Sequence, residues 1–282
     1  MRKLTALIVV GTLIAGCAHG GPRRDGAKVT GGGTGSGGVN SRELEMGRQI
    51  HQAIVSSFRI YTEPRVVGYV NRIGHKITKT ADRKDIPYQF TVLYDQRAYA
   101  TEAPGGFVYL TTGFLNFLQN EAELAAVLSH EVARLQLRDP RFSIGRRVLG
   151  AAAQTGAVVG PLFGHIGLLA ASAVVLLHAF AESRGDTPEE RLKMADGKAL
   201  LYLLQSGNDP QGYLDVLSRL LHPSPEWTPY FFDYLSSRPV TLERMQQVIE
   251  KFEDLPLNGK SFTVNRERYM EITKGVREIY QP

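Results

Sequence analysis

Residues 103–131 read Ala-Pro-Gly-Gly-Phe-Val-Tyr-Leu-Thr-Thr-Gly-Phe-Leu-Asn-Phe-Leu-Gln-Asn-Glu-Ala-Glu-Leu-Ala-Ala-Val-Leu-Ser-His-Glu. The apolar run over residues 106–111, entered through a Pro-Gly-Gly turn, predicts a strand. Asn120 and Glu123 then have the spacing of a capping box, which predicts a helix that continues through Leu135. This strand and helix decide the fold, and the helix carries a histidine and a glutamate side by side.

Helical and strand patterns flank this unit on both sides. Apolar residues at helical spacing follow Asn40 and Pro64, and residues 88–94 read as another strand. Three later segments are helical: residues 199–204, residues 213–221 and the segment after Thr241. The order of helices, then strands, then helices predicts an α+β fold that is mainly helical and has a small sheet.

The composition is that of a globular protein and excludes several other classes. The chain has 282 residues, 43% hydrophobic and 22% charged, with a net charge of +5. Its one cysteine, Cys17, excludes an intramolecular disulfide and a cysteine-based zinc cluster. Without Arg2 and Lys3 the net charge is only +3, which is too low to indicate a nucleic-acid partner.

The first 17 residues have the pattern of an export signal. Arg2 and Lys3 precede an apolar run over residues 4–15, which is too short to span a bilayer, and Leu-Ile-Ala-Gly-Cys follows. The arrangement resembles a bacterial lipoprotein signal, with an ordinary signal or a short buried helix as the alternatives. It implies cleavage after residue 16 and a lipid on Cys17, which anchors the protein to a membrane. Ala18 at the next position favours an outer-membrane anchor facing the periplasm, by resemblance to enterobacterial sorting.

Two further segments stand apart from the rest of the chain. Residues 17–40 are rich in glycine and poor in apolar side chains, which predicts a flexible tether ahead of a domain over residues 41–282. Residues 148–181 contain no Asp, Glu, Lys or Arg. We expect an apolar hairpin or lid there, packed on the domain or against a lipid surface, with a membrane span as the alternative.

His130 and Glu131 are the first candidates for chemistry. In a His-Glu-x-x-His helix, two histidines four residues apart bind one zinc ion, and the glutamate activates the water on the metal. Here Arg134 stands in place of the second histidine. A histidine and a glutamate alone on a helix are more often a hydrogen-bonded structural pair.

The motifs around this pair favour a functional site over a structural pair. Residues 103–109, 112–115 and 121–131 resemble the zinc metallopeptidase family M48, which includes the CAAX prenyl endopeptidases, Oma-type peptidases and BepA-type outer-membrane assembly peptidases. Further matching motifs extend the resemblance over roughly residues 42–250. It implies a gluzincin fold, in which one helix carries the first zinc ligands and a second helix brings the third. It also implies a sheet edge that binds substrate, placed here at Gly105, Gly106, Phe107 and Val108.

Read residue by residue, the resemblance implies a degenerate zinc site. His130 matches the first zinc ligand, Glu131 the general base, and Asp196 a supporting or catalytic acid. The second ligand position is Arg134, and the third, a glutamate in the family, is Leu192. A later histidine of the BepA-like members is replaced by Arg238. These are the retained and substituted positions of the candidate site.

The substitutions support one hypothesis about the site. A guanidinium does not bind a metal cation and would repel it. Arg134 can instead pair with Glu131, one turn away, and Arg238 can neutralise Glu131 or Asp196. We therefore expect a salt-bridged cleft that needs no cofactor.

Two functions follow from these residues. The first is a pseudopeptidase lipoprotein that binds envelope proteins or peptides, or that regulates envelope proteolysis or outer-membrane assembly. The second is an active zinc endopeptidase in envelope protein quality control. It would need another ligand, such as Glu189, although Thr187-Pro188-Glu189-Glu190 reads better as a helix start.

Overall fold

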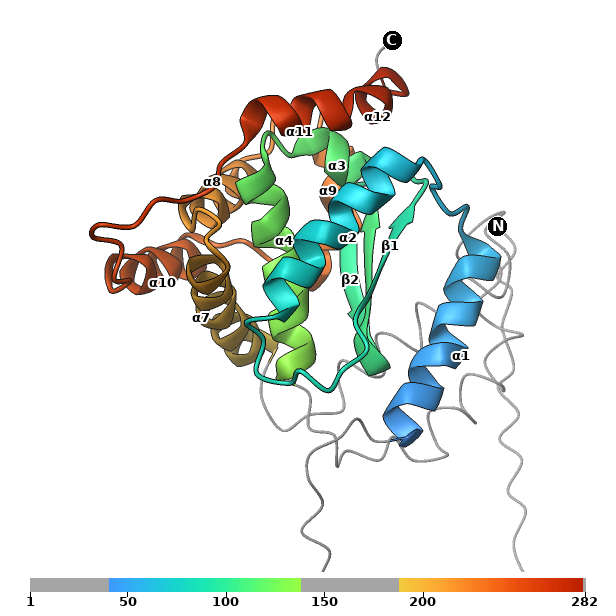
Figure 1. Cartoon of the computed structure of the whole chain (residues 1–282). Coiled ribbons are helices and arrows are strands. Elements are labelled where there is room, and N and C mark those ends of the chain that lie inside the picture. The colour runs from blue at the N-terminus through green and yellow to red at the C-terminus, as the bar shows by residue number, and fades with distance from the viewer. Residues whose placement is uncertain (1–40, 138–187, 281–282) are drawn as a thin grey trace, which may run out of the picture. The chain divides into compact units, whose positions relative to one another are not determined.

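The computed structural model describes residues 41–137 and 188–280, and its elements follow the predicted order (Figure 1). They are α1 (Ser41–Ser57), α2 (Pro64–Thr78), β1 (Gln89–Leu93), β2 (Ala100–Ala103), the short turn of 3-10 helix η1 (Pro104–Gly106), β3 (Phe107–Thr111), α3 (Thr112–Phe117), α4 (Glu121–Gln136), α7 (Pro188–Ser206), α8 (Gln211–Leu221), α9 (Thr228–Ser237), α10 (Leu242–Glu253), α11 (Arg266–Ile272) and α12 (Lys274–Glu278). The α+β prediction is confirmed. The predictions for Cys17, the signal, the tether and residues 148–181 lie outside the described residues.

The three strands form one mixed sheet in the order β1-β3-β2. Strand β3 pairs in parallel with β1 and antiparallel with β2. The tight η1 turn makes the second pairing possible: Gly105 and Gly106 have φ values of 76° and 101°, which favour glycine. A Cβ on Gly106 would lie 2.5 Å from a methyl carbon of Ile86.

This topology corrects one prediction. Gly105, Gly106, Phe107 and Val108 were expected at a substrate-binding edge of the sheet. Phe107 instead pairs with Gln89 on one side and Ala103 on the other, because β3 is the central strand. Its backbone hydrogen bonds are used within the sheet, so it has no free side to which a peptide could add.

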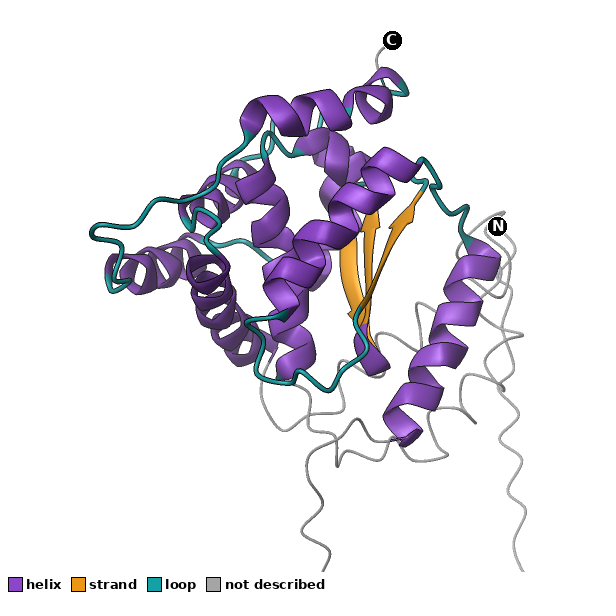
Figure 2. Ribbon diagram, viewed as in Figure 1, coloured by secondary structure: helices purple, strands orange, loops and turns teal. Residues whose placement is uncertain are grey.

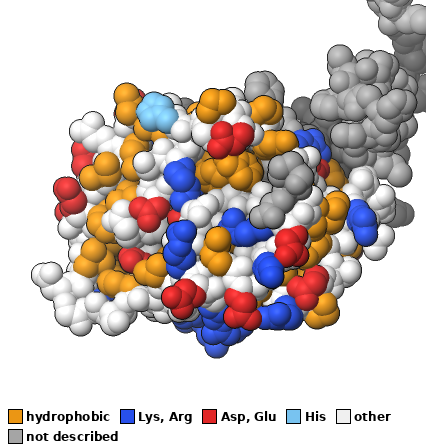
Figure 3. Space-filling view, turned by 90° about the horizontal axis from the view of Figure 1, so that it is seen from above, with side chains coloured by type: hydrophobic (Ala, Val, Ile, Leu, Met, Phe, Trp, Pro, Cys, Tyr) orange, Lys and Arg blue, Asp and Glu red, His pale blue; other side chains and the backbone are white. Residues whose placement is uncertain are grey.

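Helices cover both faces of the sheet (Figure 2). The side chains of β3 alternate, so that Phe107 and Tyr109 pack with α1 while Val108 and Leu110 belong to the larger core with α2 and α4. Because both faces are covered, every residue of β3 is buried. On the face seen from above, acidic and basic side chains lie interspersed (Figure 3).

Helix α4 lies in the middle of the larger core and begins as predicted. The Asn120 side chain accepts a hydrogen bond from Glu123 N at 2.9 Å, and the Glu123 carboxylate accepts one from Gln119 N at 2.7 Å. Helix α8 approaches closely at Gly212, where a Cβ would lie 2.7 Å from the Ala122 carbonyl carbon. This glycine lets the next residue, Tyr213, reach the middle of α4.

Within the described ranges, 41–137 and 188–280, no helix has both the length and the apolar character needed to cross a membrane.

Candidate functional site

His130 lies on the buried side of α4 and is held by α7 and α8. Its Nδ1 is 2.8 Å from the Tyr213 hydroxyl, which donates to Asp196 Oδ1 at 2.6 Å. Since the hydroxyl proton goes to Asp196, Nδ1 carries the imidazole proton and donates it to the tyrosine oxygen. The other nitrogen, Nε2, is buried and has no hydrogen-bond partner among the described residues.

The carboxylate of Asp196 is the centre of this first cluster. Arg244 donates to it through Nε at 2.9 Å and through Nη2 at 2.8 Å. Burial alone raises the pKa of Asp196, but Arg244 and the neighbouring His130, whose Nδ1 lies 3.3 Å from Asp196 Oδ1, hold it well below its usual range. Burial also lowers the pKa of His130 to about 4, although Asp196 opposes that shift. At neutral pH the cluster therefore holds a charged Asp196 and a neutral His130.

Glu131 belongs to a second cluster, which contains two carboxylates and two guanidinium groups. Arg238 Nη2 donates to Glu131 Oε2 at 2.9 Å and to Glu102 Oε2 at 3.0 Å. Arg134 Nε donates to Glu102 Oε2 at 3.1 Å and lies 3.9 Å from Glu131 Oε2. Glu131 is completely buried, and only 3% of the Arg238 side chain is exposed. Two carboxyl groups and two guanidinium groups therefore lie together in the interior.

Burial is the dominant influence on Glu131. It raises the pKa of this carboxyl to about 7; Glu102 adds to the shift, and Arg238 and Arg134 oppose it. The same carboxylates raise the pKa of Arg238 above its ordinary value, against the effect of burial. Arg238 is therefore a permanent cation beside the glutamate at the general-base position.

The structure brings most of the predicted site residues together. His130, Glu131, Arg134, Asp196 and Arg238 all belong to the two clusters. Leu192 is buried on α7, one turn before Asp196, and supplies no donor atom. Glu189 is exposed in the first turn of α7, as expected of a residue at a helix start, and Phe107 and Val108 lie in the sheet.

Sequence reasoning missed three members of the clusters: Glu102, Tyr213 and Arg244. Glu102 had a usable signal, because it is a lone acid directly before the Ala-Pro-Gly-Gly turn in a segment that β2 buries completely. Tyr213 and Arg244 lie on helices far along the chain, and nothing near them in sequence marks them.

Within residues 41–137 and 188–280, the donor set does not fit a catalytic zinc ion. Such an ion takes three protein ligands and a water. The retained side chains offer His130 Nε2 and Glu131 Oε1, which have no hydrogen-bond partners among the described residues. By resemblance to the family, Arg134 and Leu192 stand at the other ligand positions. The described residues contain no group of three or more His, Cys, Asp or Glu side chains that could hold a metal.

Comparison with known proteins establishes the family. The profile of Peptidase family M48 matches residues 64–251, which is about two-thirds of the chain. The chain belongs to peptidase family M48. This confirms the resemblance stated from the motifs, and members of this family are zinc metallopeptidases.

Similar proteins with curated names come from several bacteria. The beta-barrel assembly-enhancing protease of Yersinia pestis is 26% identical over 235 residues, which cover 78% of this chain and 46% of that protein. The protein of that name from Escherichia coli K12 is 23% identical over 194 residues, covering 67% of this chain and 40% of the relative. A putative one from Vibrio cholerae is 26% identical over 121 residues, covering 43% and 25%. The chain thus spans less than half the length of these relatives.

Removal of Arg238 tests whether its positive charge stabilises the second cluster. We expect Arg238→Met to lower the free energy of unfolding by about 3–5 kcal/mol, because it leaves two buried carboxylates without their main cation. Adding Glu131→Gln should recover part of that loss, since one carboxylate is then neutral. Urea denaturation of the single and double variants measures both effects.

Arg65→Met is the matched control. Arg65 and Glu271 are 2.8 Å apart, but their side chains are 65% and 70% exposed. The loss of this pair should cost less than about 1 kcal/mol. Equal losses in Arg65→Met and Arg238→Met would contradict the assignment of Arg238 as a buried counter-ion.

The buried His130 should make stability depend on pH. Its pKa is about 4 in the folded chain, below the 6.5 of a histidine exposed to water, so the unfolded chain binds the proton more readily. The free energy of unfolding should therefore fall as pH drops from 6.5 towards 4, by about 3 kcal/mol for this group. The raised pKa of Glu131 acts in the opposite direction as pH falls below 7.

Comparison with His130→Gln isolates the histidine contribution. Between neutral and mildly acid pH, the wild-type protein should lose more stability than this variant, by about 2–3 kcal/mol. The exposed His75 provides the control variant His75→Gln, whose profile should follow the wild type. Parallel profiles for wild type and His130→Gln would show that His130 is not a buried neutral imidazole.

Proposed function

We propose that this chain is a pseudopeptidase of the bacterial envelope. It retains the family fold without zinc-dependent hydrolysis and binds protein clients, or regulates proteolysis or outer-membrane assembly. The observation that carries this proposal is the hydrogen bond from Arg238 to Glu131. It joins a permanent cation to the carboxylate that would otherwise activate water.

The chemistry of Glu131 supports the proposal. A general base must reach the proton of a water held beside the substrate. Glu131 Oε2 accepts from Arg238, and the whole residue is inaccessible to solvent. Arg134 also places a positive charge within 4 Å of this carboxylate, at the ligand position where a metal ion needs an electron pair.

The cellular setting is part of the same proposal. The relatives are named for enhancing the assembly of β-barrel proteins, which suggests envelope proteins as clients or as the system regulated. A lipid on Cys17 would anchor the chain, and residues 17–40 would tether the domain to the periplasmic face of the outer membrane. Zinc and nucleic acid have no part in this proposal.

The two edges of the sheet differ as candidate surfaces for client binding. Tyr61 N donates to Val92 O on the outer side of β1, and Ala98 N, just before β2, donates to Tyr230 O. Arg238 also reaches Thr101 and Glu102 of β2. The Tyr61 contact occupies part of the β1 edge, whereas the Ala98 contact lies just before β2 and Arg238 donates to side chains of β2. The β1 edge is therefore the poorer candidate for client binding.

The second candidate, an active zinc endopeptidase, is favoured by one observation. His130 Nε2 and Glu131 Oε1 are buried polar atoms without hydrogen-bond partners among the described residues. An unpaired imidazole nitrogen on a histidine held by an acid is the arrangement of a metal ligand. Proteolysis would require further ligands and a rearrangement of Arg238.

A cleavage assay tests the proposal. The purified full-length chain, supplied with zinc and casein, should release no more peptide than its Glu131→Gln variant, because Glu131 is held by Arg238. Peptide release that requires zinc and disappears in Glu131→Gln would establish the active peptidase instead. The Yersinia pestis relative serves as the positive control for the assay.

Glu189→Gln is the matched control variant, because it removes an exposed carboxylate of α7 outside both clusters. It should behave as the wild type. Loss of a zinc-dependent activity in Glu189→Gln would identify this residue as the replacement ligand and would again contradict the proposal.

A further inference from the structure

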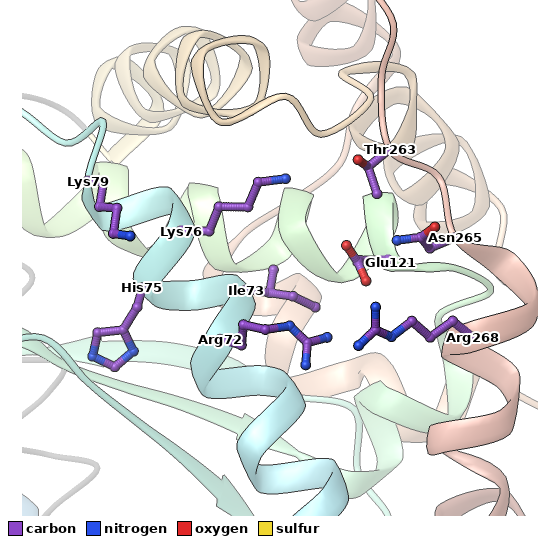
Figure 4. Close-up of a pocket in the computed structure, with 9 residues that line it drawn as sticks. All are labelled: Arg72, Ile73, His75, Lys76, Lys79, Glu121, Thr263, Asn265 and Arg268. Atoms are coloured by element: carbon purple, nitrogen blue, oxygen red, sulfur yellow. The ribbon is translucent and has the colours of Figure 1, made fainter.

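A basic pocket lies where α2 and α11 come together beside the first residue of α4 (Figure 4). Its volume is about 470 Å³. It is lined by Arg72, Ile73, His75, Lys76, Lys79, Glu121, Thr263, Asn265 and Arg268. Four of these side chains are permanent cations at neutral pH and one is an acid, so the pocket has an excess of positive charge.

The two arginines are placed alike, on opposite walls of the pocket. The Arg72 guanidinium carbon lies 4.7 Å from the centre of the Tyr69 ring, and that of Arg268 lies 6.0 Å from the same ring. Their guanidinium groups point toward one another (Figure 4). Neither forms an ion pair with any residue in the described parts of the chain. Two cations that face each other in this way favour an anion between them.

Glu121 does not supply that anion. Its Oε2 accepts a hydrogen bond from the Tyr69 hydroxyl at 2.7 Å, and the residue is only 6% exposed. It also lies in the first turn of α4, where the helix dipole stabilises a negative charge. The carboxylate is therefore held by the Tyr69 hydroxyl, and the guanidinium donors of Arg72 and Arg268 stay available to a ligand.

Other donors complete the pocket. Lys76 Nζ donates a long hydrogen bond, 3.4 Å, to Asn208 Oδ1, which an incoming anion can replace. The Asn265 side chain makes no capping hydrogen bond to α11. His75 is not part of the donor set, because its ring packs edge-on against Phe90 and its Nδ1 is 2.7 Å from Asn71 O.

We propose that this pocket binds a phosphate group, with Arg72 and Arg268 as the direct donors from the two walls. One arginine satisfies a carboxylate with two parallel bonds, whereas two forks from opposite sides match the several oxygens of a tetrahedral phosphate dianion. The group belongs either to a lipid headgroup or to a soluble phosphate. The proposal does not depend on the proposed function, because the pocket shares no residue with the two buried clusters.

Calorimetric titration of the purified full-length chain tests the pocket. The probes are inorganic phosphate, pyrophosphate and acetate at low salt. The phosphates should bind more tightly than acetate, and Arg72→Gln or Arg268→Gln should weaken phosphate binding by about tenfold or more. Both arginines are exposed, so thermal unfolding should show that the two variants remain folded.

Arg266→Gln is the matched control, since Arg266 is exposed on the same helix but does not line the pocket. It should leave phosphate binding within about twofold of the wild type. If no phosphate probe binds, or if Arg266→Gln weakens binding as much as Arg268→Gln, the proposal is wrong.

Short-chain lipids distinguish the two sources of the phosphate. Dihexanoyl phosphatidic acid carries a phosphate monoester, and dihexanoyl phosphatidylcholine is the control without one. Tighter binding of the phosphatidic acid than of inorganic phosphate identifies a lipid headgroup, and equal binding identifies a soluble phosphate; both support the pocket. Equal binding of the two lipids, unaffected by Arg268→Gln, would show adhesion through acyl chains and contradict it.

Discussion

The hydrogen bonds from Arg238 to Glu131 and Glu102 solve the main electrostatic problem of this domain. Two carboxylates in a water-excluded interior repel each other and lose their hydration, so they need a cation between them or a proton. In a zinc peptidase the metal supplies positive charge at the active-site helix. Here a guanidinium at the end of α9 donates to both carboxylates, and Arg134 of α4 donates to one of them.

The same requirement explains the neighbouring cluster. Asp196 keeps its negative charge because Arg244 donates two hydrogen bonds to it, and Tyr213 adds a third. This acid in turn fixes the tautomer of His130. The residues that resemble a catalytic centre are therefore held in two buried networks of hydrogen bonds and ion pairs. The main counter-ion of each network, Arg238 or Arg244, comes from the C-terminal part of the chain. The C-terminal segments therefore supply buried counter-ions beside α4, in addition to packing against this helix.

Local patterns in the sequence were sufficient for part of this account. The Asn120 and Glu123 capping box placed the start of α4, and the alternation of β3 follows from its apolar run. Strand β2 was not predicted, because Ala-Thr-Glu-Ala is short and rich in residues that are poor strand formers. The segment is a strand because it pairs with β3 across the η1 turn. The partners of Asp196 could not be found locally, since Arg244 is 48 residues away. The sheet order, which makes β3 central, also depends on such long-range pairing.

The most direct measurement is the zinc content of the purified full-length chain, determined by mass spectrometry after incubation with zinc and removal of unbound metal. If arginines have replaced the metal at the buried carboxylates, zinc should remain far below one ion per chain. Changing His130 to Gln should then have no effect on the zinc content. One zinc ion per chain, lost in His130→Gln, would contradict the account.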